Sequence, residues 1–303
     1  MFREMVLGLG NNRAVSSVVK RYGMQMGAAR FVAGDSLTSA IQVTRDLNRR
    51  GILVTLDHLG EAVREERAAT QARDSYLAML DQIASTQVKA NVSLKLTMMG
   101  LAVSEELARQ NLIVIAQKAQ EAKSFVRIDM EDSSVTSVTV ALFQEIWRQY
   151  PAHLGLVLQS YLYRSQDDLK QLSDPPKNFR IVKGAYQEPV SVAFPSKTDV
   201  DDNYVELVKQ SLDLGNYTAI ATHDEAIIGR VLKVIHHLDV PRDQFEFQML
   251  YGVKLPVLEQ LAREGYTARV YVPFGQDWYA YYVRRIAERP ANLLFFARAL
   301  INR

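Results

Sequence analysis

NVSLKL (91–96), SEELARQNLIVIAQKAQEA (104–122) and FVRIDM (125–130) together decide the fold. The first and third segments are short and apolar, as strands are, and the long middle segment has a helical pattern. A strand, a helix and a second strand in this order are typical of a crossover unit with two parallel strands. This region therefore predicts a parallel sheet whose faces are covered by helices.

The same alternation repeats along most of the chain. Eight short apolar segments occur, and longer helical patterns such as 202–215 separate them. Eight strand–helix units in about 250 residues fit a closed (β/α)8 barrel, and an open doubly wound sheet is the alternative. The predicted strands are 52–57, 91–96, 125–130, 154–159, 179–184, 217–222, 245–250 and 268–273.

The two ends of the chain differ from this repeat. Residues 1–50 are predicted to form an N-terminal helical segment, and 51–303 the barrel domain with its C-terminal helices. A break at AGDS (33–36) separates two helices within the first segment, and Asp35 or Ser36 is the candidate cap of the second. PANLLFFARALINR (290–303) is strongly apolar. We expect it to pack on the barrel, and contact with a membrane is the alternative.

The composition excludes several functions. The 303 residues, 48% of them hydrophobic, support a sizeable core. Lys plus Arg is 36 and Asp plus Glu is 34, so the chain lacks the basic footprint of a nucleic-acid-binding protein. Without cysteine there are no disulfides or thiolate metal sites, and the five histidines are scattered. With no signal-type apolar start and no apolar run of about 18 residues, we expect a cytoplasmic protein.

Active sites of (β/α)8 barrels lie at the C-terminal ends of the strands, so polar residues at those ends are candidates. Lys95 is the most informative, because burying an unpaired ammonium within an apolar strand is costly. It shares one strand face with Ser93 and Thr97. The alternative is an edge lysine that extends its charge to solvent. The strand-end residues are Asp57, His58, Lys95, Thr97, Asp129, Glu131, Gln159, Arg180, Lys183, Thr222, His223, Leu250 and Tyr271.

A second cluster of polar residues occurs in YYVRRIAERP (281–290). Tyr281, Arg284, Arg285 and Glu288 have the spacing that puts four residues on one helix face. Ion pairs on a solvated helix are one explanation of this pattern. A carboxylate clamp is the other, because guanidinium groups bind carboxylates in a bidentate manner. Nothing in the sequence matches a dinucleotide turn, since GLGNNR (8–13) follows no strand and lacks the third glycine.

Eight motifs occur in the same order as in a known protein family. The chain resembles bacterial monofunctional proline dehydrogenase, an FAD enzyme that begins proline catabolism, from about residue 50 to 295. The paired arginines of YxxRRxxE are the most specific part of the resemblance. The motifs are LDHLGE (56–61), VSLKLT (92–97), VRIDMED (126–132), RIVKGAY (180–186), ATHD (221–224), FQMLYG (247–252), RVYVPFG (269–275) and YYVRRIAER (281–289).

The resemblance implies a reaction and a substrate site. L-proline is oxidised to Δ1-pyrroline-5-carboxylate by hydride transfer from ring C5 to flavin N5, and a membrane quinone then takes the electrons. Functional coupling to a pyrroline-5-carboxylate dehydrogenase follows from the same family. The last helix lies over the barrel mouth. The implied substrate residues are Lys95, Arg284 and Arg285 at the carboxylate, Glu288 as the partner of an arginine, Tyr271 and Tyr281 as walls, Leu250 as the floor, and Glu61 as a gate that pairs with Arg284.

The resemblance also implies the residues that hold FAD. Arg180 is expected near flavin N5 or the pyrophosphate, and Gly184 where the cofactor approaches the backbone closely. The alternatives are an ordinary turn glycine for Gly184 and a helix-capping residue for His223. The expected location of the protein is the cytoplasm, or the inner face of the membrane as a peripheral protein. The implied FAD residues are Asp129, Gln159, Arg180, Val182, Gly184, Ala185, Thr222, His223, Arg285 and Glu288.

Two rival functions suit the same fold. One is a class I aldolase-like lyase, in which Lys95 or Lys183 forms a Schiff base with the substrate. The other is a barrel that binds an amino acid without catalysis. A flavin spectrum favours the dehydrogenase, and a borohydride-trapped lysine adduct favours the aldolase. Ligand binding with neither signal favours the binding protein.

Overall fold

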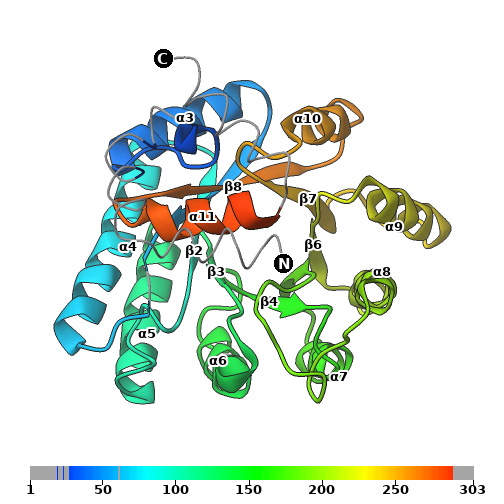
Figure 1. Cartoon of the computed structure of the whole chain (residues 1–303), viewed down its shortest axis with the longest axis horizontal. Coiled ribbons are helices and arrows are strands. Elements are labelled where there is room, and N and C mark those ends of the chain that lie inside the picture. The colour runs from blue at the N-terminus through cyan, green and yellow to red at the C-terminus, as the bar shows by residue number, and fades with distance from the viewer. Residues whose placement is uncertain (1–18, 20–22, 24–26, 61, 289–303) are drawn as a thin grey trace.

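The computed structural model describes residues 19, 23, 27–60 and 62–288 of the chain. Eight parallel strands form a closed barrel, in which each strand pairs with its sequence neighbours and β8 pairs with β1 (Figure 1). The predicted (β/α)8 architecture is thereby confirmed, and the open sheet is excluded. The strands are β1 (Leu53–His58), β2 (Ala90–Leu94), β3 (Val126–Ile128), β4 (Leu154–Gln159), β5 (Asn178–Val182), β6 (Tyr217–Ala221), β7 (Phe245–Leu250) and β8 (Ala268–Phe274).

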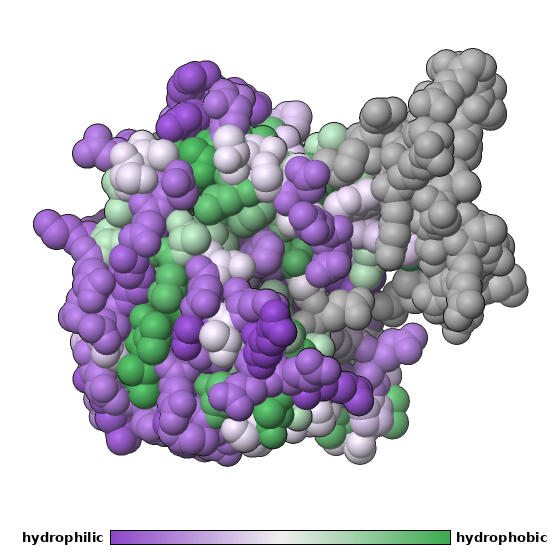
Figure 2. Space-filling view, turned by 90° about the vertical axis from the view of Figure 1, so that its left-hand side faces the viewer, coloured by the Kyte–Doolittle hydropathy of each residue, from purple (hydrophilic) through white to green (hydrophobic). Residues whose placement is uncertain are grey.

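Helices surround the barrel, and α11 lies across the strands in the view of Figure 1. Over the helices on one side of the molecule, Figure 2 shows mainly hydrophilic side chains with scattered hydrophobic patches. Within residues 27–60 and 62–288, every helix is too short or too polar to cross a lipid bilayer. The helices are η1 (Ala28–Arg30), α3 (Leu37–Arg49), α4 (Glu66–Thr86), α5 (Glu105–Glu121), α6 (Ser133–Trp147), α7 (Ser165–Leu172), α8 (Lys197–Asp213), α9 (Glu225–His237), α10 (Leu255–Arg263) and α11 (Trp278–Glu288).

Helix α3 completes the outer wall of the barrel. It packs against both β1 and β8, the place that the helix after the last strand takes in a standard (β/α)8 barrel. Two backbone hydrogen bonds tie its approach to β8, from Ala33 N to Pro273 O (2.9 Å) and from Gly275 N to Gly34 O (3.0 Å). Because α3 fills the wall, α11 lies at the mouth instead. The division of the chain at residue 50 stays a prediction.

The start of α3 follows from local side-chain chemistry. Of the two candidate caps, it is Ser36 whose hydroxyl accepts a hydrogen bond from Ser39 N at 3.3 Å. After the helix, Gly51 has a φ of 77°, a backbone conformation that favours glycine. A capped start and a glycine stop thus set α3 to the length that spans β1 and β8.

The strands are apolar on the helix side and polar on the inside of the barrel. On β1, Val54 and Leu56 belong to the hydrophobic core, whereas Thr55 and Asp57 alternate with them and project inward. Register continues this polar layer around the barrel, since Asp57 lies opposite Ser93, and Ser93 opposite Arg127. Buried charges are costly unless they are paired or hydrogen-bonded, so the inside must be a connected network.

Candidate active site

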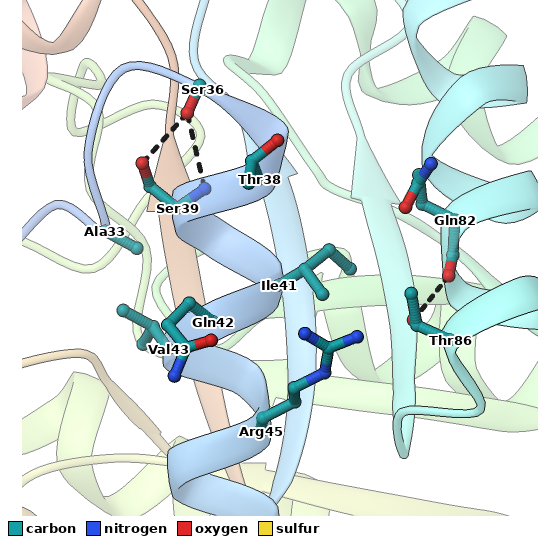
Figure 3. A pocket seen from close by; sticks show the side chains of 10 residues that line it. All are labelled: Ala33, Ser36, Thr38, Ser39, Ile41, Gln42, Val43, Arg45, Gln82 and Thr86. Atoms are coloured by element: carbon teal, nitrogen blue, oxygen red, sulfur yellow. Dashed lines mark hydrogen bonds between the residues drawn. The ribbon is translucent and has the colours of Figure 1, made fainter.

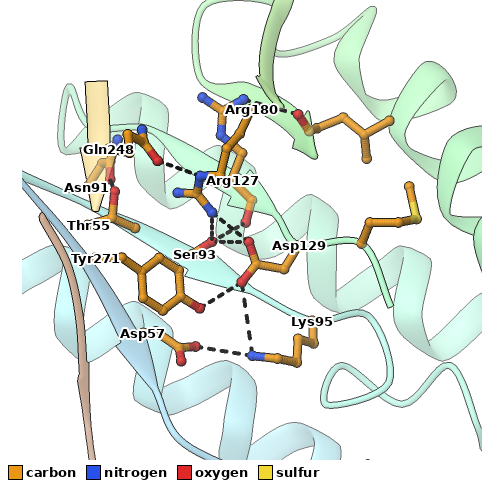
Figure 4. A network of polar contacts seen from close by, with 12 residues as sticks. Thr55, Asp57, Asn91, Ser93, Lys95, Arg127, Asp129, Arg180, Gln248 and Tyr271 are labelled. Carbon is orange, nitrogen blue, oxygen red and sulfur yellow. Dashed lines mark hydrogen bonds and ion pairs between the residues drawn. The ribbon is translucent and has the colours of Figure 1, made fainter. Parts of the chain in front are cut away.

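Asp129 is the centre of the polar network at the barrel mouth (Figure 4). It lies just past the end of β3, and its backbone N–H still donates to Leu94 O at 2.8 Å. One carboxylate oxygen accepts from Arg180 Nη1 (2.7 Å) and Ser93 Oγ (2.6 Å). The other accepts from the Tyr271 hydroxyl (2.7 Å). Strands β2, β5 and β8 therefore converge on one carboxylate, which holds the site in a fixed geometry.

Lys95 lies at the same mouth and remains a cation. Its ammonium is 3.4 Å from Asp57 Oδ1 and 4.0 Å from Asp129 Oδ2. Burial lowers the pKa of Lys95, but the two carboxylates outweigh burial and raise this pKa above its usual value. The side chain is 23% exposed, so it is paired within the barrel and still accessible from the mouth. Lys95 is therefore not an edge lysine that merely reaches solvent.

Asp57 is a site residue that sequence analysis left without a role. It is 1% exposed, and burial raises the pKa of its carboxyl group while the nearby Lys95 opposes that rise. A carboxylate so deeply buried needs its cation, so Asp57 fixes the ammonium of Lys95. Its position at the end of a strand was the available signal. The partner lies 38 residues away and depends on the register of β1 and β2.

A series of buried side chains inside the barrel orients Arg180. Its Nε donates to Gln248 Oε1 at 2.6 Å, and Gln248 in turn donates to Glu246. Glu246 is paired with Arg269 at 2.8 Å. The guanidinium carbon of Arg180 lies 5.3 Å from the centre of the Tyr271 ring. These contacts orient Arg180 at the base of the mouth.

Gln159 has an unused acceptor at the end of β4. The residue is 2% exposed, and its Nε2 donates weakly to Met130 O at 3.5 Å. Its Oε1 is buried without a hydrogen-bond partner within the described part of the chain. A buried orphan acceptor is rare and suits the N–H donor of a ligand. Val182, opposite Gln159 in the sheet register, is the neighbouring residue at the end of β5.

Gly184 follows β5 in a conformation that requires glycine. Its φ is 113°, and a Cβ atom there would lie 2.4 Å from a ring carbon of Tyr161. The group that approaches this backbone is therefore the Tyr161 ring, so the cofactor is not needed to explain the glycine. Ala185, the next residue, is exposed. The two residues place the backbone of this loop at the rim of the mouth.

Thr222 and His223 follow β6. Thr222 Oγ1 accepts from Asp224 N at 3.2 Å, and the Asp224 side chain caps α9. The expected alternative role of His223 as a helix cap is therefore taken by Asp224. Instead, His223 Nε2 accepts from Leu250 N at 2.9 Å, which requires the proton to be on Nδ1. This bond joins the loop after β6 to the end of β7. Leu250 at that end was predicted to form the apolar floor of the substrate site.

Lys183 is an ion-pair residue. Its ammonium lies 2.6 Å from Asp201 and 3.2 Å from Asp224. Both carboxylates belong to helices outside the barrel, at α8 and at the start of α9. Lys183 therefore joins strand β5 to its neighbours at the surface.

Helix α11 has a buried face and an accessible face. Trp278, Tyr282 and Ile286 pack with residues around η1 in a second hydrophobic cluster. Tyr281 is 7% exposed, and the guanidinium carbon of Arg285 lies 5.1 Å from its ring centre. Arg284 is exposed. The motif is thus not simply an ion-paired face of a solvated helix. Glu61 and the side chain of Glu288 lie outside the described residues.

Tyr186, in the loop after β5, was missed as a site residue. Burial raises the pKa of its hydroxyl to about 12, and the carboxylate of Glu131 adds to the rise. The cations of Lys95 and Arg284 act in the opposite direction. The phenol therefore lies within the electrostatic range of both predicted clamp residues. The KGAY motif (183–186) was the signal, because it puts a tyrosine just past a strand end.

A cavity elsewhere on the molecule has no connection with this network. It has a volume of about 550 Å³ and lies between α3 and the C-terminal part of α4, on the outside of the barrel (Figure 3). Ser36 and Ser39 at the start of α3 face it, with Gln82 and Thr86 on the other side. No residue of the mouth lines it. Nor do the described residues contain a group of His, Asp and Glu suited to a metal ion.

Comparisons with known proteins agree on one family. The proline dehydrogenase family model matches residues 40–298. Over 303 residues, which is all of both chains, 42% of positions are identical to proline dehydrogenase 1 of Bacillus subtilis (strain 168). The proline dehydrogenase of Deinococcus radiodurans is also 42% identical, over all of this chain and 98% of its own.

Larger proteins share the same region. The crystal structure of proline utilization A (PutA) from Bdellovibrio bacteriovorus, inactivated by N-propargylglycine, has a TM-score of 0.83 and 27% identity. The match covers 91% of this chain and 34% of that one. The bifunctional protein PutA of Escherichia coli is 25% identical over 91% of this chain, which spans 24% of its length.

Proposed function

The chain belongs to the proline dehydrogenase family and is a flavin-dependent oxidoreductase that acts on proline, and from its site we infer that the flavin is FAD. The observation that carries the detailed proposal is the accessible ammonium of Lys95 at the barrel mouth, held by Asp57 and Asp129. Arg284 is exposed on α11, so a second cation is accessible from a separate element. This is a site for a small carboxylate with an apolar ring.

The proline carboxylate binds to Lys95 and the α11 arginines in this proposal. Lys95 is suited to the task because Asp57 keeps it charged and fixed. Arg284 and Arg285 supply the planar forks that match a carboxylate. Proline arrives with a protonated amine, and hydride departure requires a neutral one. Cations beside the substrate favour loss of that proton.

The proline ring lies against Tyr271, Tyr281 and Leu250 in the same proposal. Tyr271 is fixed by its hydrogen bond to Asp129, so its ring offers a rigid wall. Tyr281 is 7% exposed, and its ring lies beside the guanidinium of Arg285. Glu288 as the holder of an arginine, and Glu61 as a gate for Arg284, stay predictions. Rigid apolar walls keep water from the reacting carbon.

The residues beside the mouth fit FAD. Gln159 Oε1 is a buried acceptor that awaits a donor, as the ring of a flavin provides. Arg180 and Asp129 are held at the base, and Val182, Gly184, Ala185, Thr222 and His223 lie at consecutive strand ends suited to the rest of the cofactor. When bound, FAD accepts the hydride that leaves ring C5, and proline becomes Δ1-pyrroline-5-carboxylate.

The surroundings of the two candidate lysines argue against an aldolase. A Schiff-base lysine must lose its proton to act as a nucleophile. The carboxylates beside Lys95 raise its pKa, which keeps it protonated. Lys183 is bound between two aspartates at the surface. Neither lysine has the environment of a nucleophile.

The electron acceptor and location are further parts of the proposal. We propose a membrane quinone as the acceptor, and the cytoplasm, at the inner face of the membrane, as the place of the reaction. Relatives named as bifunctional PutA support a link to a pyrroline-5-carboxylate dehydrogenase that consumes the product. A test is reoxidation of the reduced protein by lipid vesicles with and without quinone.

The absorbance spectrum of the purified protein tests the central proposal. We expect flavin bands, a cofactor that is released on denaturation as FAD, and bleaching by anaerobic L-proline without NAD. Unchanged bands after proline addition would contradict the assignment of substrate. Release of FMN would contradict the assignment of cofactor alone.

A further inference from the structure

Glu188 joins the loop after β5 to the start of α6. Its Oε1 accepts a hydrogen bond from Ser133 N at 2.7 Å, and its Oε2 accepts from Ser133 Oγ at 2.5 Å. The Tyr161 hydroxyl donates to Oε1 over 3.4 Å. The two bonds to Ser133 cross 55 residues of sequence, so both carboxylate oxygens are used in tertiary contacts.

The start of α6 is a favourable place for this carboxylate. Helix N-termini carry unpaired N–H groups and a partial positive charge, which stabilise an anion. The helix already has its own cap, because Asp132 accepts from Ser134 N at 3.0 Å. Glu188 therefore does not serve as the ordinary cap of α6. It is a second carboxylate, brought by another loop.

The outer half of the same loop is held separately. Tyr163 N donates to Val192 O at 3.1 Å, and Phe194 N donates to Tyr161 O at 2.8 Å. The Tyr163 hydroxyl also donates to Val190 O at 3.0 Å. These bonds fasten the loop to the segment after β4. Glu188 is a side-chain tie of the half of the loop nearest to the mouth.

Tyr186 lies two positions before Glu188 on this half of the loop. Helix α6 follows directly after Asp129 and Glu131, which belong to the mouth. The bonds to Ser133 therefore fix the loop relative to the strand end that carries the central carboxylate. The position of Tyr186 relative to this strand end therefore depends on the connection.

We propose that Glu188 is a positioning residue, which latches the Tyr186 loop over the substrate site by binding the start of α6. The inference rests on the proposed substrate site for its kinetic consequence, and on the contacts alone for the latch itself. Releasing the latch lets Tyr186 leave the mouth. Substrate binding then weakens, while the flavin site below remains intact.

Kinetics of two single variants test the role. Glu188→Gln keeps the side-chain size but turns one acceptor into a donor, and Ser133→Ala removes the hydroxyl bond alone. We expect KM for L-proline to rise about ten-fold in Glu188→Gln, the order expected for one charge-assisted hydrogen bond, with a smaller rise in Ser133→Ala. kcat at saturating proline and flavin content should change less than two-fold, roughly, because ligand binding re-forms the closed loop.

Asp132→Ala is the matched control, since it removes the side-chain cap of the same helix without touching the loop. It should lower the melting temperature and leave KM unchanged. The double variant of Glu188→Gln with Ser133→Ala should show little beyond the larger single effect, because both break one interaction. If Glu188→Gln only lowers the melting temperature as the control does, the carboxylate is a helix-end residue and the proposal is overturned.

Limited proteolysis tests the latch without reference to activity. Chymotrypsin cleaves after aromatic residues, and Tyr186 is exposed in the loop. Cleavage after Tyr186 should accelerate about five-fold or more in Glu188→Gln and stay unchanged in Asp132→Ala. Equal cleavage in all variants would overturn the latch. Faster cleavage together with no reaction toward proline would confirm the latch and contradict the proposed substrate site.

Discussion

Tyr271 donates its phenolic proton to Asp129 over 2.7 Å, which joins the last strand of the barrel to the end of the third. The bond closes the ring of interactions that begins with Arg180 and Ser93 on the other carboxylate oxygen. One carboxylate thus fixes both an aromatic wall and a cation at the mouth. These contacts within the protein fix the geometry of the mouth, and a fixed geometry favours a reaction that depends on precise orientation.

Tyr271→Phe removes this hydroxyl and keeps the ring. The free energy of unfolding should fall by about 1.5–3 kcal/mol, as for other hydrogen bonds to a charged group. Flavin reduction by proline should slow, because Asp129 loses the bond that holds it away from Lys95. Tyr266→Phe is the control, since the Tyr266 hydroxyl makes a weak 3.4 Å contact with His236 in an exposed place. Stopped-flow reduction and chemical denaturation give the two values. Equal effects of both variants would contradict the role of Asp129 as an anchor.

Lys95→Ala removes the cation at the predicted carboxylate position. FAD should remain bound, while anaerobic flavin reduction slows on the order of 100-fold, as expected when one partner of a desolvated charge pair is lost. The variant also leaves Asp57 buried without its cation, which destabilises the fold. Adding Asp57→Asn should restore stability and not activity. Loss of FAD with intact proline affinity would show that Lys95 belongs to the cofactor site.

Tyr281→Ser opens space at the far edge of the proposed substrate pocket. We expect the ratio of kcat/KM for ring-hydroxylated proline to that for proline to rise, because a small hydroxyl replaces an aromatic wall. Tyr282→Ser is the matched control on the buried side of α11, where Tyr282 packs near Phe31 and Trp278. That variant should lower stability and leave the ratio unchanged. A constant ratio in Tyr281→Ser would put the residue outside the pocket.

Gly184→Ala puts a methyl group where the Tyr161 ring lies and imposes a positive φ on alanine. The melting temperature and the FAD content should both fall, with a loss of stability of about 1–3 kcal/mol for the strained backbone alone. Adding Tyr161→Ala should recover the part that comes from the clash. If the double variant is no better than Gly184→Ala, the strain is entirely in the backbone. A stable Gly184→Ala with full FAD content would refute the packing explanation.

His58 makes stability depend on pH. Burial lowers the pKa of its imidazole below the usual value of 6.5, although Asp57 and Asp277 oppose the change. The unfolded chain takes up the proton first, so the contribution of His58 to stability is present above about pH 6.5 and is lost as pH falls through the lower folded value. His58→Phe should reduce the drop in melting temperature between about pH 7 and pH 5. His237→Gln, on the exposed end of α9, is the control. An unchanged drop in His58→Phe would contradict the shift.

The barrel was predictable because its signal is local and repeated. Each strand is a short apolar segment, and eight such segments with helices between them leave few other architectures. The third strand was predicted as 125–130 but spans only Val126–Ile128. Asp129 leaves the strand to meet Arg180 and Tyr271, which are far away in sequence. A strand ends early where tertiary contacts of its side chains compete with the backbone hydrogen bonds to the neighbouring strand. The spacing of apolar residues in the sequence carries no information about such contacts.

Pairing inside the barrel was less predictable. A lysine in an apolar strand indicated a special position, yet the sequence did not identify Asp57 as its partner. That pair requires the register between β1 and β2, which only the closed barrel defines. The same holds for Gly184, whose neighbour Tyr161 comes from the preceding loop. Residue types at strand ends thus revealed where the site lies, and three-dimensional packing decided which residues fix one another.

Helix α3 fills the place in the barrel wall that the helix after the last strand usually takes, and α11 lies at the mouth instead. This arrangement has a consequence for the order in which the parts of the fold are synthesised. Every element of the barrel wall, from α3 to β8, precedes α11 in the chain. The wall contains all its own strands and covering helices before Trp278 has been translated, and domains fold from the N-terminal side as the chain emerges. Among the described elements, the helix with the paired arginines is therefore the last to be made, and the cover of the mouth is the last part of this fold to be completed.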